Sequence, residues 1–558
     1  MNDITKKKKI LWCGETGFVS SGYGVATKEL MRRFYDSGKY ELAEHASYIA
    51  PNDPRIKTIP WKIYGNMPVT PEEHEAYNGN PQNQFGFWRF DEVVLNFRPD
   101  IVIGIRDHWM DSHILHSPLK KYYSTLMMPT VDSAPQSTEW IADYCDVDTV
   151  LTYTEFSKRV LEEESGYKIK VLDTPGLGVN TEVFSPVQNK YEHKKQYGLE
   201  NKIIIGTVMR NQKRKLFSDL FDAFRDFCLK YPQKSANVYL YCHTSYPDLG
   251  WDLPRLIRDS GISHKILFTY YCSTCGNFFV SNFQDAKTVC EHCNRPTASL
   301  PNVIKGVSDK QLNHIYNLFD LYIQYAMNEG LGVPLLEASA CAVPFMAVNY
   351  SAMESVTRTL DGYPINIGRA FRETESYAIR VYPDNNDFIE KLYKFITLPE
   401  VLRVKKGRRC YELFLKHYTW DVVASKWMNA IDSTNIYDNW DSPPQFHQPN
   451  TNIPPGLSNI DFVRWCIVNI LGDISKLNSY LESKLLRNLN YGASIDGHGG
   501  FHFSDLSNPN FQPRFTEFDH KKLVNILLDY RQRMNYTEHR RVNYNQQELP
   551  MFIQEALH

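Results

Sequence analysis

Short apolar segments alternate with segments of helical periodicity over the first third of the chain. The pattern predicts a helix at Ala26–Tyr35 and strands at Lys9–Cys13, Ile101–Ile105, Ser124–Met128 and Thr149–Tyr153. Strands that are apolar along their whole length are buried on both faces, which is typical of a parallel sheet covered by helices. The first third is therefore predicted to form a doubly wound α/β domain.

The middle of the chain repeats this alternation. It predicts a helix at Lys215–Lys230 and strands at Lys202–Val208, Val238–Cys242, Ile266–Thr269, Leu321–Tyr325 and Pro344–Val348. Two α/β sheets in series are therefore expected, joined near Phe184–Asn201. The proline-rich segment Asp441–Gly456 is typical of a linker, and the spacing at Asn459–Leu489 and Phe518–Asn535 predicts helices beyond it.

The composition is that of an ordinary multidomain globular protein. The 558 residues are 42% hydrophobic and 23% charged, which excludes a disordered chain, a collagen-like fibre and a disulfide-stabilised miniprotein. The formal net charge of -2 gives no global attraction to nucleic acid or membranes. No apolar run approaches the ~18 residues of a membrane span, and the lysines Lys6–Lys9 lead directly into a strand instead of a signal sequence.

The 11 cysteines do not have the spacing of a secreted disulfide framework, so a reducing, cytoplasmic location is predicted. Four of them form two CxxC pairs, Cys272 with Cys275 and Cys290 with Cys293, separated by 14 residues. Each pair can present two thiolates to one tetrahedral ion, and Gly276 supplies a tight turn after the first pair. The sequence therefore predicts a closed, structural zinc site within residues 270–296.

Two loops carry residues suited to phosphates and sugars. Arg210 and Lys215 lie five residues apart on a loop that opens a helix and that is expected to be exposed. Cations at a helix N-terminus suit a diphosphate, although a solvated basic turn has the same composition.

The second loop contains Glu329 and Glu337, eight residues apart around the turn Gly330-Leu331-Gly332. The glycines allow backbone amides to approach a phosphate closely, and carboxylates accept hydrogen bonds from vicinal hydroxyls. An acidic helix start would explain Glu329 alone, but not the whole pattern.

These motifs together resemble the retaining glycosyltransferases of the large family four type, which have the GT-B fold. The resemblance rests on the E-x7-E segment Asn328–Ala338 and on five further segments in the expected order: Thr154–Ser157, Gly178–Pro186, Val307–Leu312, Ala340–Pro344 and Trp420–Ala424. It covers roughly residues 8–435 and implies two Rossmann-like domains that face a cleft.

The resemblance implies a role for each matching residue in binding a nucleotide-diphosphate sugar. Arg210 and Lys215 would hold the diphosphate, Glu337 the ribose and Glu329 the donor sugar. The remaining donor-binding positions are Gly22, Gly24, Val307, Gly330, Leu331 and Gly332. Retention in this family requires no carboxylate nucleophile, because the departing phosphate takes the proton of the acceptor.

The chain departs from the family where many relatives carry a histidine on the first domain. His108 follows one predicted strand and Asp132 follows the next; both are candidates for this catalytic position, and Asp132 is favoured. Asp146 and Asp148 form a lone D-x-D, the metal grip of the other glycosyltransferase fold, at a place where the family has an ordinary aspartate. No catalytic metal is expected.

The resemblance divides the chain as follows: residues 1–190 form the first, acceptor-side domain, 191–415 the nucleotide-sugar domain with its zinc ribbon, 416–435 a helix that crosses back, 436–456 the linker and 457–558 a helical extension of unknown role. The expected activity is transfer of a hexose or pentose to a hydroxyl of a glycan or small molecule. A modified base in viral DNA is the alternative acceptor, and a catalytically inactive scaffold is the alternative of another class.

Overall fold

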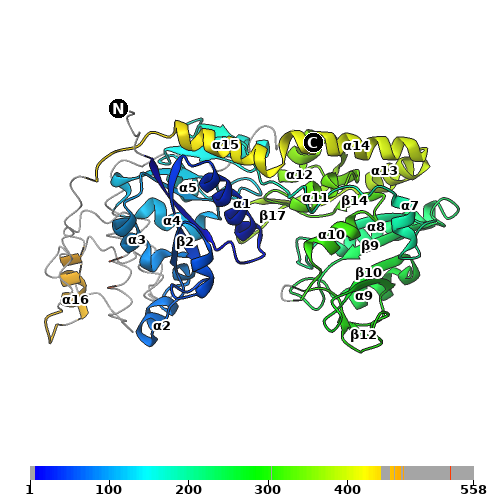
Figure 1. The fold of residues 1–558 in the computed structure, drawn as a ribbon, viewed down its shortest axis with the longest axis horizontal. Coiled ribbons are helices and arrows are strands. Elements are labelled where there is room, and N and C mark those ends of the chain that lie inside the picture. Colours follow the sequence, from blue (N-terminus) through cyan, green and yellow to red (C-terminus); the bar gives the residue numbers. More distant parts are fainter. Residues whose placement is uncertain are drawn as a thin grey trace, which may run out of the picture.

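The computed structural model describes residues 7–117, 119–302, 305–440, 453–457, 459–466, 469–470, 524 and 528. Its two lobes each contain a sheet covered by helices, fully parallel in one lobe and parallel except for β11, β12 and β13 in the other, and the long helices α14 and α15 run along one side of the pair (Figure 1). We call the lobe formed by residues 7–173 the N-lobe and the lobe formed by residues 190–417 the C-lobe.

The N-lobe contains a seven-stranded parallel sheet of order β3-β2-β1-β4-β5-β6-β7. Its strands are β1 (Lys8–Glu15), β2 (Tyr40–Ser47), β3 (Lys62–Gly65), β4 (Ile101–Gly104), β5 (Ser124–Met127), β6 (Thr149–Leu151) and β7 (Val171–Asp173). Its helices are α1 (Gly22–Asp36), α2 (Pro71–Asn78), α3 (Phe90–Phe97), α4 (His108–His116), α5 (Thr138–Tyr144) and α6 (Glu155–Glu164). Every residue of β4 and β5 is buried, as expected of central strands covered on both faces.

The C-lobe contains a nine-stranded sheet of order β12-β13-β10-β9-β8-β14-β15-β16, with β11 paired to β10. The strands are β8 (Ile203–Val208), β9 (Val238–His243), β10 (Ile266–Cys272), β11 (Phe278–Asn282), β12 (Lys287–Thr288), β13 (Ala298–Ser299), β14 (Leu321–Gln324), β15 (Phe345–Val348) and β16 (Tyr363–Ile365). The helices are α7 (Lys190–Lys195), α8 (Phe217–Lys230), α9 (Leu253–Ser260), α10 (Asp309–Tyr316), α11 (Val333–Ala340), α12 (Ser351–Thr359), α13 (Asn385–Thr397) and α14 (Glu400–His417).

A separate two-stranded antiparallel sheet, β17 (Ile367–Arg372) with β18 (Ile379–Pro383), follows β16. Beyond α14, helix α15 (Trp420–Ser433) returns to the N-lobe, and α16 (Asn459–Cys466) is described further along the chain. The predicted helices at Asn459–Leu489 and Phe518–Asn535 otherwise lie outside the described residues, as does most of the predicted linker.

The attachment of α15 to the N-lobe combines apolar packing with capping. Trp427 is fully buried and its ring lies 5.6 Å from that of Trp12 on β1. Lys8 donates from Nζ to the backbone oxygens of Ile431, Asp432 and Thr434, each at 2.9 Å. A cation at these otherwise unpaired carbonyls stabilises the end of the helix.

The two lobes also contact each other where the chain crosses between them and through two helices. Where the chain leaves the N-lobe and where it returns, the segments lie side by side, and Val179 donates from its amide to the oxygen of Tyr418 at 3.0 Å. Helices α6 and α12 also meet, because Arg159 forms an ion pair with Glu354 at 2.8 Å. These contacts fix the lobes around the region between them.

We expect that Trp427→Ala reduces stability by about 3–5 kcal/mol, the usual cost of removing a buried aromatic side chain. Trp109→Ala is the matched control, because Trp109 is 44% exposed. Thermal and denaturant unfolding of both variants measure the difference. Equal stabilities would contradict the role assigned to α15.

Candidate functional site

Two loops meet at the carboxyl edge of the C-lobe sheet. Strands β8 and β14 are parallel neighbours, so the loops that follow them emerge at the same edge. The loops are joined through their backbones, because Leu216 donates to Tyr325 at 3.0 Å and Met327 donates to Arg214 at 2.9 Å. Sheet pairing thus brings the cationic loop and the E-x7-E loop together, although they are far apart in the sequence.

A buried ion pair between Lys215 and Glu329 forms the centre of this edge. Each residue is 6% exposed, and the Lys215 ammonium contacts Glu329 Oε1. Arg214 donates to Glu329 Oε2 at 2.9 Å, and Gln324 donates to Oε1. Both oxygens of the carboxylate are therefore satisfied by cations or amides, as a buried charge requires.

The expectation that Lys215 lies on an exposed loop is wrong. Its side chain points inward, because Glu329 and Gln324 provide a polar interior for the ammonium. Arg210 remains at the surface, where it forms a bidentate pair with Asp248 at 2.8 and 2.9 Å. The guanidinium that joins the Lys215–Glu329 pair is instead that of Arg214, a residue which the sequence did not single out.

The turn before α11 brings backbone amides to the same edge. Gly332 is the N-cap of α11 and has a φ of 82°, a conformation that favours glycine. At Gly330 a Cβ atom would lie 2.8 Å from Thr130 Cγ2 of the N-lobe, so glycine permits the close approach of the two lobes. Leu331 between them is buried.

Glu337 lies on α11, one turn beyond this start. The hydroxyl of Tyr316 on α10 donates to its Oε2 at 2.6 Å. Burial raises the pKa of Glu337 to about 7, although the Tyr316 hydrogen bond opposes the shift. The carboxyl therefore changes its protonation state close to neutral pH.

The glycine-rich loop of the N-lobe faces this edge from the other side. Ser21 caps α1 by accepting from the amide of Gly24 at 3.0 Å, and Gly22 begins the helix. The hydroxyls of Tyr23 and Thr130 are hydrogen-bonded at 2.8 Å. Since Thr130 also approaches Gly330, the start of α1 lies next to the E-x7-E loop.

Asp132 and His108 have different surroundings. Asn328 donates to Asp132 Oδ2, and Arg380 donates to Oδ1 at 3.3 Å, so Asp132 contacts the C-lobe. His108 is buried inside the N-lobe, where its Nε2 lies 2.7 Å from Asp143 Oδ2. These contacts bring Asp132, and not His108, to the residues around Glu329.

A further carboxyl lies beside Asp132. Asp107 is the N-cap residue of α4 but forms no side-chain capping bond. Burial, followed by the charges of Asp132 and Asp111, raises its pKa to about 6. No motif indicated Asp107, since its significance depends on the proximity of residues from two different strands.

The other predicted positions are placed as follows. Val307 is partly buried against the core, next to the N-cap of α10. Asp148 of the D-x-D forms an ion pair with Lys120 at 3.0 Å and accepts from the amide of Thr125, so its carboxylate forms contacts inside the N-lobe.

A pocket of about 630 Å³ lies between Gln212–Arg214 and Phe371–Glu375 on the β17–β18 hairpin.

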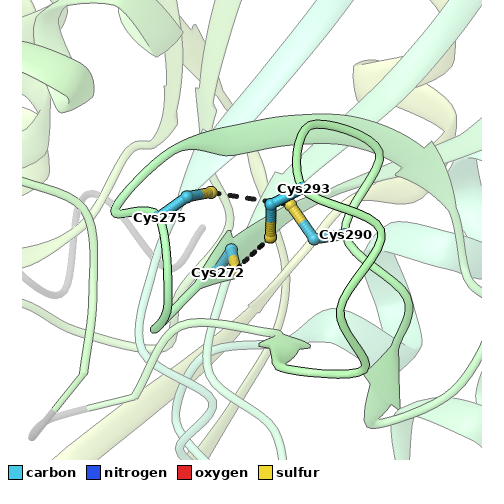
Figure 2. Close-up of side chains that lie close together, drawn as sticks. All are labelled: Cys272, Cys275, Cys290 and Cys293. Atoms are coloured by element: carbon cyan, nitrogen blue, oxygen red, sulfur yellow. Dashed lines mark hydrogen bonds between the residues drawn. The ribbon is translucent and has the colours of Figure 1, made fainter.

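The four clustered cysteines converge on one point. Their sulfur atoms all lie within 4.8 Å of one another, and the side chains of both CxxC pairs point toward a common centre (Figure 2). The Sγ atoms of Cys272 and Cys293 are 3.7 Å apart, as are those of Cys275 and Cys290. A tetrahedral ion with zinc–sulfur bonds of ~2.3 Å requires sulfur separations of about 3.8 Å, so this geometry fits a metal such as zinc.

The two CxxC pairs have matching backbone turns. Gly276 donates to the oxygen of Cys272, and Asn294 donates to that of Cys290, both at 2.9 Å. Gly276 and Asn294 have φ values of 71° and 58°, which glycine and asparagine tolerate best. His292 is not part of the cluster, and its Nε2 lies 3.1 Å from the oxygen of Phe278.

Comparison with known proteins agrees with this architecture. Residues 301–373 match the family Glycosyl transferases group 1. Three solved structures are similar: a sucrose-phosphate synthase from Thermosynechococcus elongatus (12% identity, 76% of this chain and 98% of that one, TM-score 0.53), a glycosyltransferase from Rickettsia africae (15%, 76% and 97%, 0.52), and an E. coli trehalose-6-phosphate protein bound with UDP-2-fluoro glucose (11%, 77% and 100%, 0.53). No curated protein has a significantly similar sequence.

These similarities confirm the predicted GT-B fold. The matched family segment contains Glu329 and Glu337, and together with the fold it indicates a glycosyltransferase. Among the described residues, no helix combines the length and apolarity needed to cross a membrane. All eleven cysteines are described and none is disulfide-bonded.

We expect one zinc ion per chain, bound by four sulfur atoms at ~2.3 Å. Replacing Cys290 and Cys293 by serine should abolish the metal and loosen residues 270–296, because the unfolded segment has no preformed site. Elemental analysis and X-ray absorption measure the metal. Cys228→Ser is the control, since Cys228 lies outside the cluster; full stability of the double variant would contradict a structural metal.

Proposed function

We propose that the protein is a retaining glycosyltransferase that uses a nucleotide-diphosphate sugar. The observation that carries this proposal is the buried Lys215–Glu329 ion pair with Arg214 at its side. Cations and a carboxylate are fixed together at the carboxyl edge of the C-lobe sheet, next to the amides before α11. This combination suits a ligand that carries both phosphates and sugar hydroxyls.

The proposed donor lies along this edge. Glu337 accepts from the ribose, the diphosphate lies near Lys215 and the amides of Gly330–Gly332, and Glu329 contacts the transferred sugar. Arg210 is retained as the second diphosphate ligand, which requires its guanidinium to leave Asp248. The complex of the E. coli relative with UDP-2-fluoro glucose supports a nucleotide-sugar donor.

The proposed reaction breaks the bond between the anomeric carbon and the diphosphate oxygen. The bonding electrons pass to the diphosphate, whose negative charge grows, and the acceptor oxygen bonds to the anomeric carbon on the same face. The acceptor proton passes to the departing phosphate oxygen. Fixed cations aimed at the diphosphate stabilise this charge without reorganisation, often the largest contribution to catalysis, and we propose that they suffice without a catalytic metal.

We propose Asp132 as the N-lobe residue that faces the donor sugar, because it contacts Asn328 and therefore lies beside Glu329.

The acceptor is proposed to be a hydroxyl of a glycan or small molecule. Three lysines that a DNA acceptor could contact have partners within the protein: Lys8 caps α15, Lys9 pairs with Glu41, and Lys406 pairs with Asp361. Glycan, small-molecule and modified-DNA acceptors are each incubated with a panel of nucleotide sugars, and mass spectrometry shows which acceptor gains a sugar. A protein that modifies none of them is an inactive scaffold.

We expect Lys215→Ala, Arg214→Ala and Arg210→Ala each to reduce turnover at least ten-fold, because each removes a charge-assisted contact worth ~1.5–3 kcal/mol. Lys215→Ala should also reduce stability, since it leaves Glu329 buried without its main partner. Lys213→Ala is the control, because Lys213 is exposed on the same loop. Unchanged turnover in Arg210→Ala beside a large loss in Arg214→Ala would assign the second diphosphate contact to Arg214.

The two carboxylates should separate binding from transfer. Glu329→Ala is expected to slow transfer more than it weakens nucleotide binding, and Glu337→Ala the reverse. Because the pKa of Glu337 is about 7, its ionised form increases as pH rises, and nucleotide affinity should increase about five-fold between about pH 6 and about pH 8, since charged acceptors form stronger hydrogen bonds.

Calorimetric titration with UDP and other nucleoside diphosphates measures this effect. Glu337→Gln is the matched control, because it keeps the shape of the side chain without a titrating proton and also corrects for titration of the phosphates. The same pH dependence in both proteins would overturn the assignment of Glu337 to the ribose.

A further inference from the structure

The β17–β18 hairpin belongs to neither main sheet. It follows the last strand of the C-lobe sheet, and β17 lies between the two lobes (Figure 1). A two-stranded hairpin is marginally stable by itself, so its position depends on contacts with the rest of the protein. Those contacts involve both lobes.

Backbone contacts of Ile379 fix the second strand. Its amide donates to the oxygen of Ala134 in the N-lobe at 2.7 Å. Its own oxygen accepts from the Tyr350 hydroxyl of the C-lobe at 2.9 Å. Ile379 and Val381 are buried at 6% and 0% exposure, so β18 is held from two sides.

Arg380 lies between these two buried residues, and its side chain bridges two carboxylates. It donates to Glu373 Oε2 on the same hairpin at 2.9 Å and to Asp132 Oδ1 of the N-lobe at 3.3 Å. The side chain is only 14% exposed, whereas that of Asp132 is 36% exposed. Glu373 thus orients the guanidinium, and the guanidinium contacts Asp132.

The second oxygen of Asp132 is bound by a different part of the C-lobe. Asn328 donates to Oδ2, and Asn328 directly precedes Glu329. The backbone oxygen of Asn328 in turn accepts from Arg214 at 3.0 Å. Asp132 is therefore connected by hydrogen bonds both to the hairpin and to the loop that carries the buried ion pair.

We infer that Arg380 is a positioning residue for Asp132, and that the β17–β18 hairpin assembles the reacting centre across the two lobes. Only the expected effect of Arg380 on kcat rests on the proposed function. Arg380 and Asn328 each bind one oxygen of Asp132, so together they fix the direction of its carboxylate. Loss of Arg380 leaves Asp132 on a single hydrogen bond from the C-lobe, and it weakens the attachment of the hairpin to the N-lobe, which then depends on the bond between Ile379 and Ala134.

A double-mutant cycle tests whether Arg380 acts through Asp132. Arg380→Gln and Asp132→Asn should each lower kcat about ten-fold or more, measured as sugar transfer or donor hydrolysis with the nucleotide sugar that the parent uses. The double variant should be no slower than Asp132→Asn alone, because both changes remove one arrangement. Multiplicative losses would overturn the inference.

Two comparisons separate positioning from a general structural effect. Arg380→Lys should recover part of the lost kcat, and UDP affinity should stay within about two-fold in Arg380→Gln, since Arg380 contacts no proposed nucleotide ligand. Arg369→Gln is the matched control on the same hairpin, because Arg369 is exposed. A loss in Arg369→Gln equal to that in Arg380→Gln, or no recovery with lysine, contradicts a specific role.

Hydrogen exchange tests the hairpin contact without any activity. In the parent, the amide of Ile379 should be protected by Ala134; in Arg380→Gln its exchange should rise at least ten-fold above that in Arg369→Gln. Unchanged protection would refute the interlobe role of Arg380. If the parent neither binds nor hydrolyses any nucleotide sugar, the proposed function fails, while the exchange result still decides whether Arg380 holds the hairpin to the N-lobe.

Discussion

The buried pairing of Lys215 with Glu329 is the constraint around which the cleft is arranged. Neither charge is stable in the interior without the other, because desolvating a single ion costs several kcal/mol. Arg214 and Gln324 also donate to Glu329, so the carboxylate is held from three sides and about one of its acceptor positions stays open. The loops after β8 and β14 therefore have one arrangement in which all these groups are satisfied, and that arrangement presents the turn before α11 to the N-lobe.

The facing lobe meets this arrangement through small and polar residues. Thr130 comes close to Gly330, where a larger residue would separate the lobes, and the adjoining Asp132 contacts Asn328 and Arg380. Such contacts are individually weak compared with a packed apolar interface. The paired chain crossings at Val179 and Tyr418 and the packing of α15 on β1 provide the stronger connection between the lobes.

The sequence predicts the strands that are buried on both faces, because continuous apolar runs such as Ile101–Ile105 have few alternatives in a large soluble chain. It also predicts the cysteine cluster, since the CxxC spacing itself defines the geometry. It does not reveal β2, whose buried residues include Glu44 and His45. Glu44 accepts a hydrogen bond from the Trp61 indole at 3.1 Å, and the His45 ring lies 6.2 Å from that of Phe90; such tertiary contacts have no local signal.

The same reason explains which site residues were missed. Lys215 and Glu329 belong to motifs that one sequence can display, whereas Arg214, Asn328 and Arg380 gain their importance only from contacts between distant segments. Arg380 lies 248 residues from Asp132 in the chain, on a hairpin without a distinctive pattern. A motif thus identifies the ligand-binding loop, while the residues that orient it are found only when both lobes are seen together.

Helix α10 connects the cysteine segment, residues 270–296, to the rest of the C-lobe. Gln311 completes the capping box of α10 and also donates to the oxygen of Gly276 at 2.7 Å, so the first CxxC turn rests on the start of this helix. Tyr316 at the other end of α10 donates to Glu337. The first CxxC turn and the carboxyl on α11 therefore both contact one eight-residue helix. A displacement of the cysteine segment reaches Glu337 unless α10 stays in place.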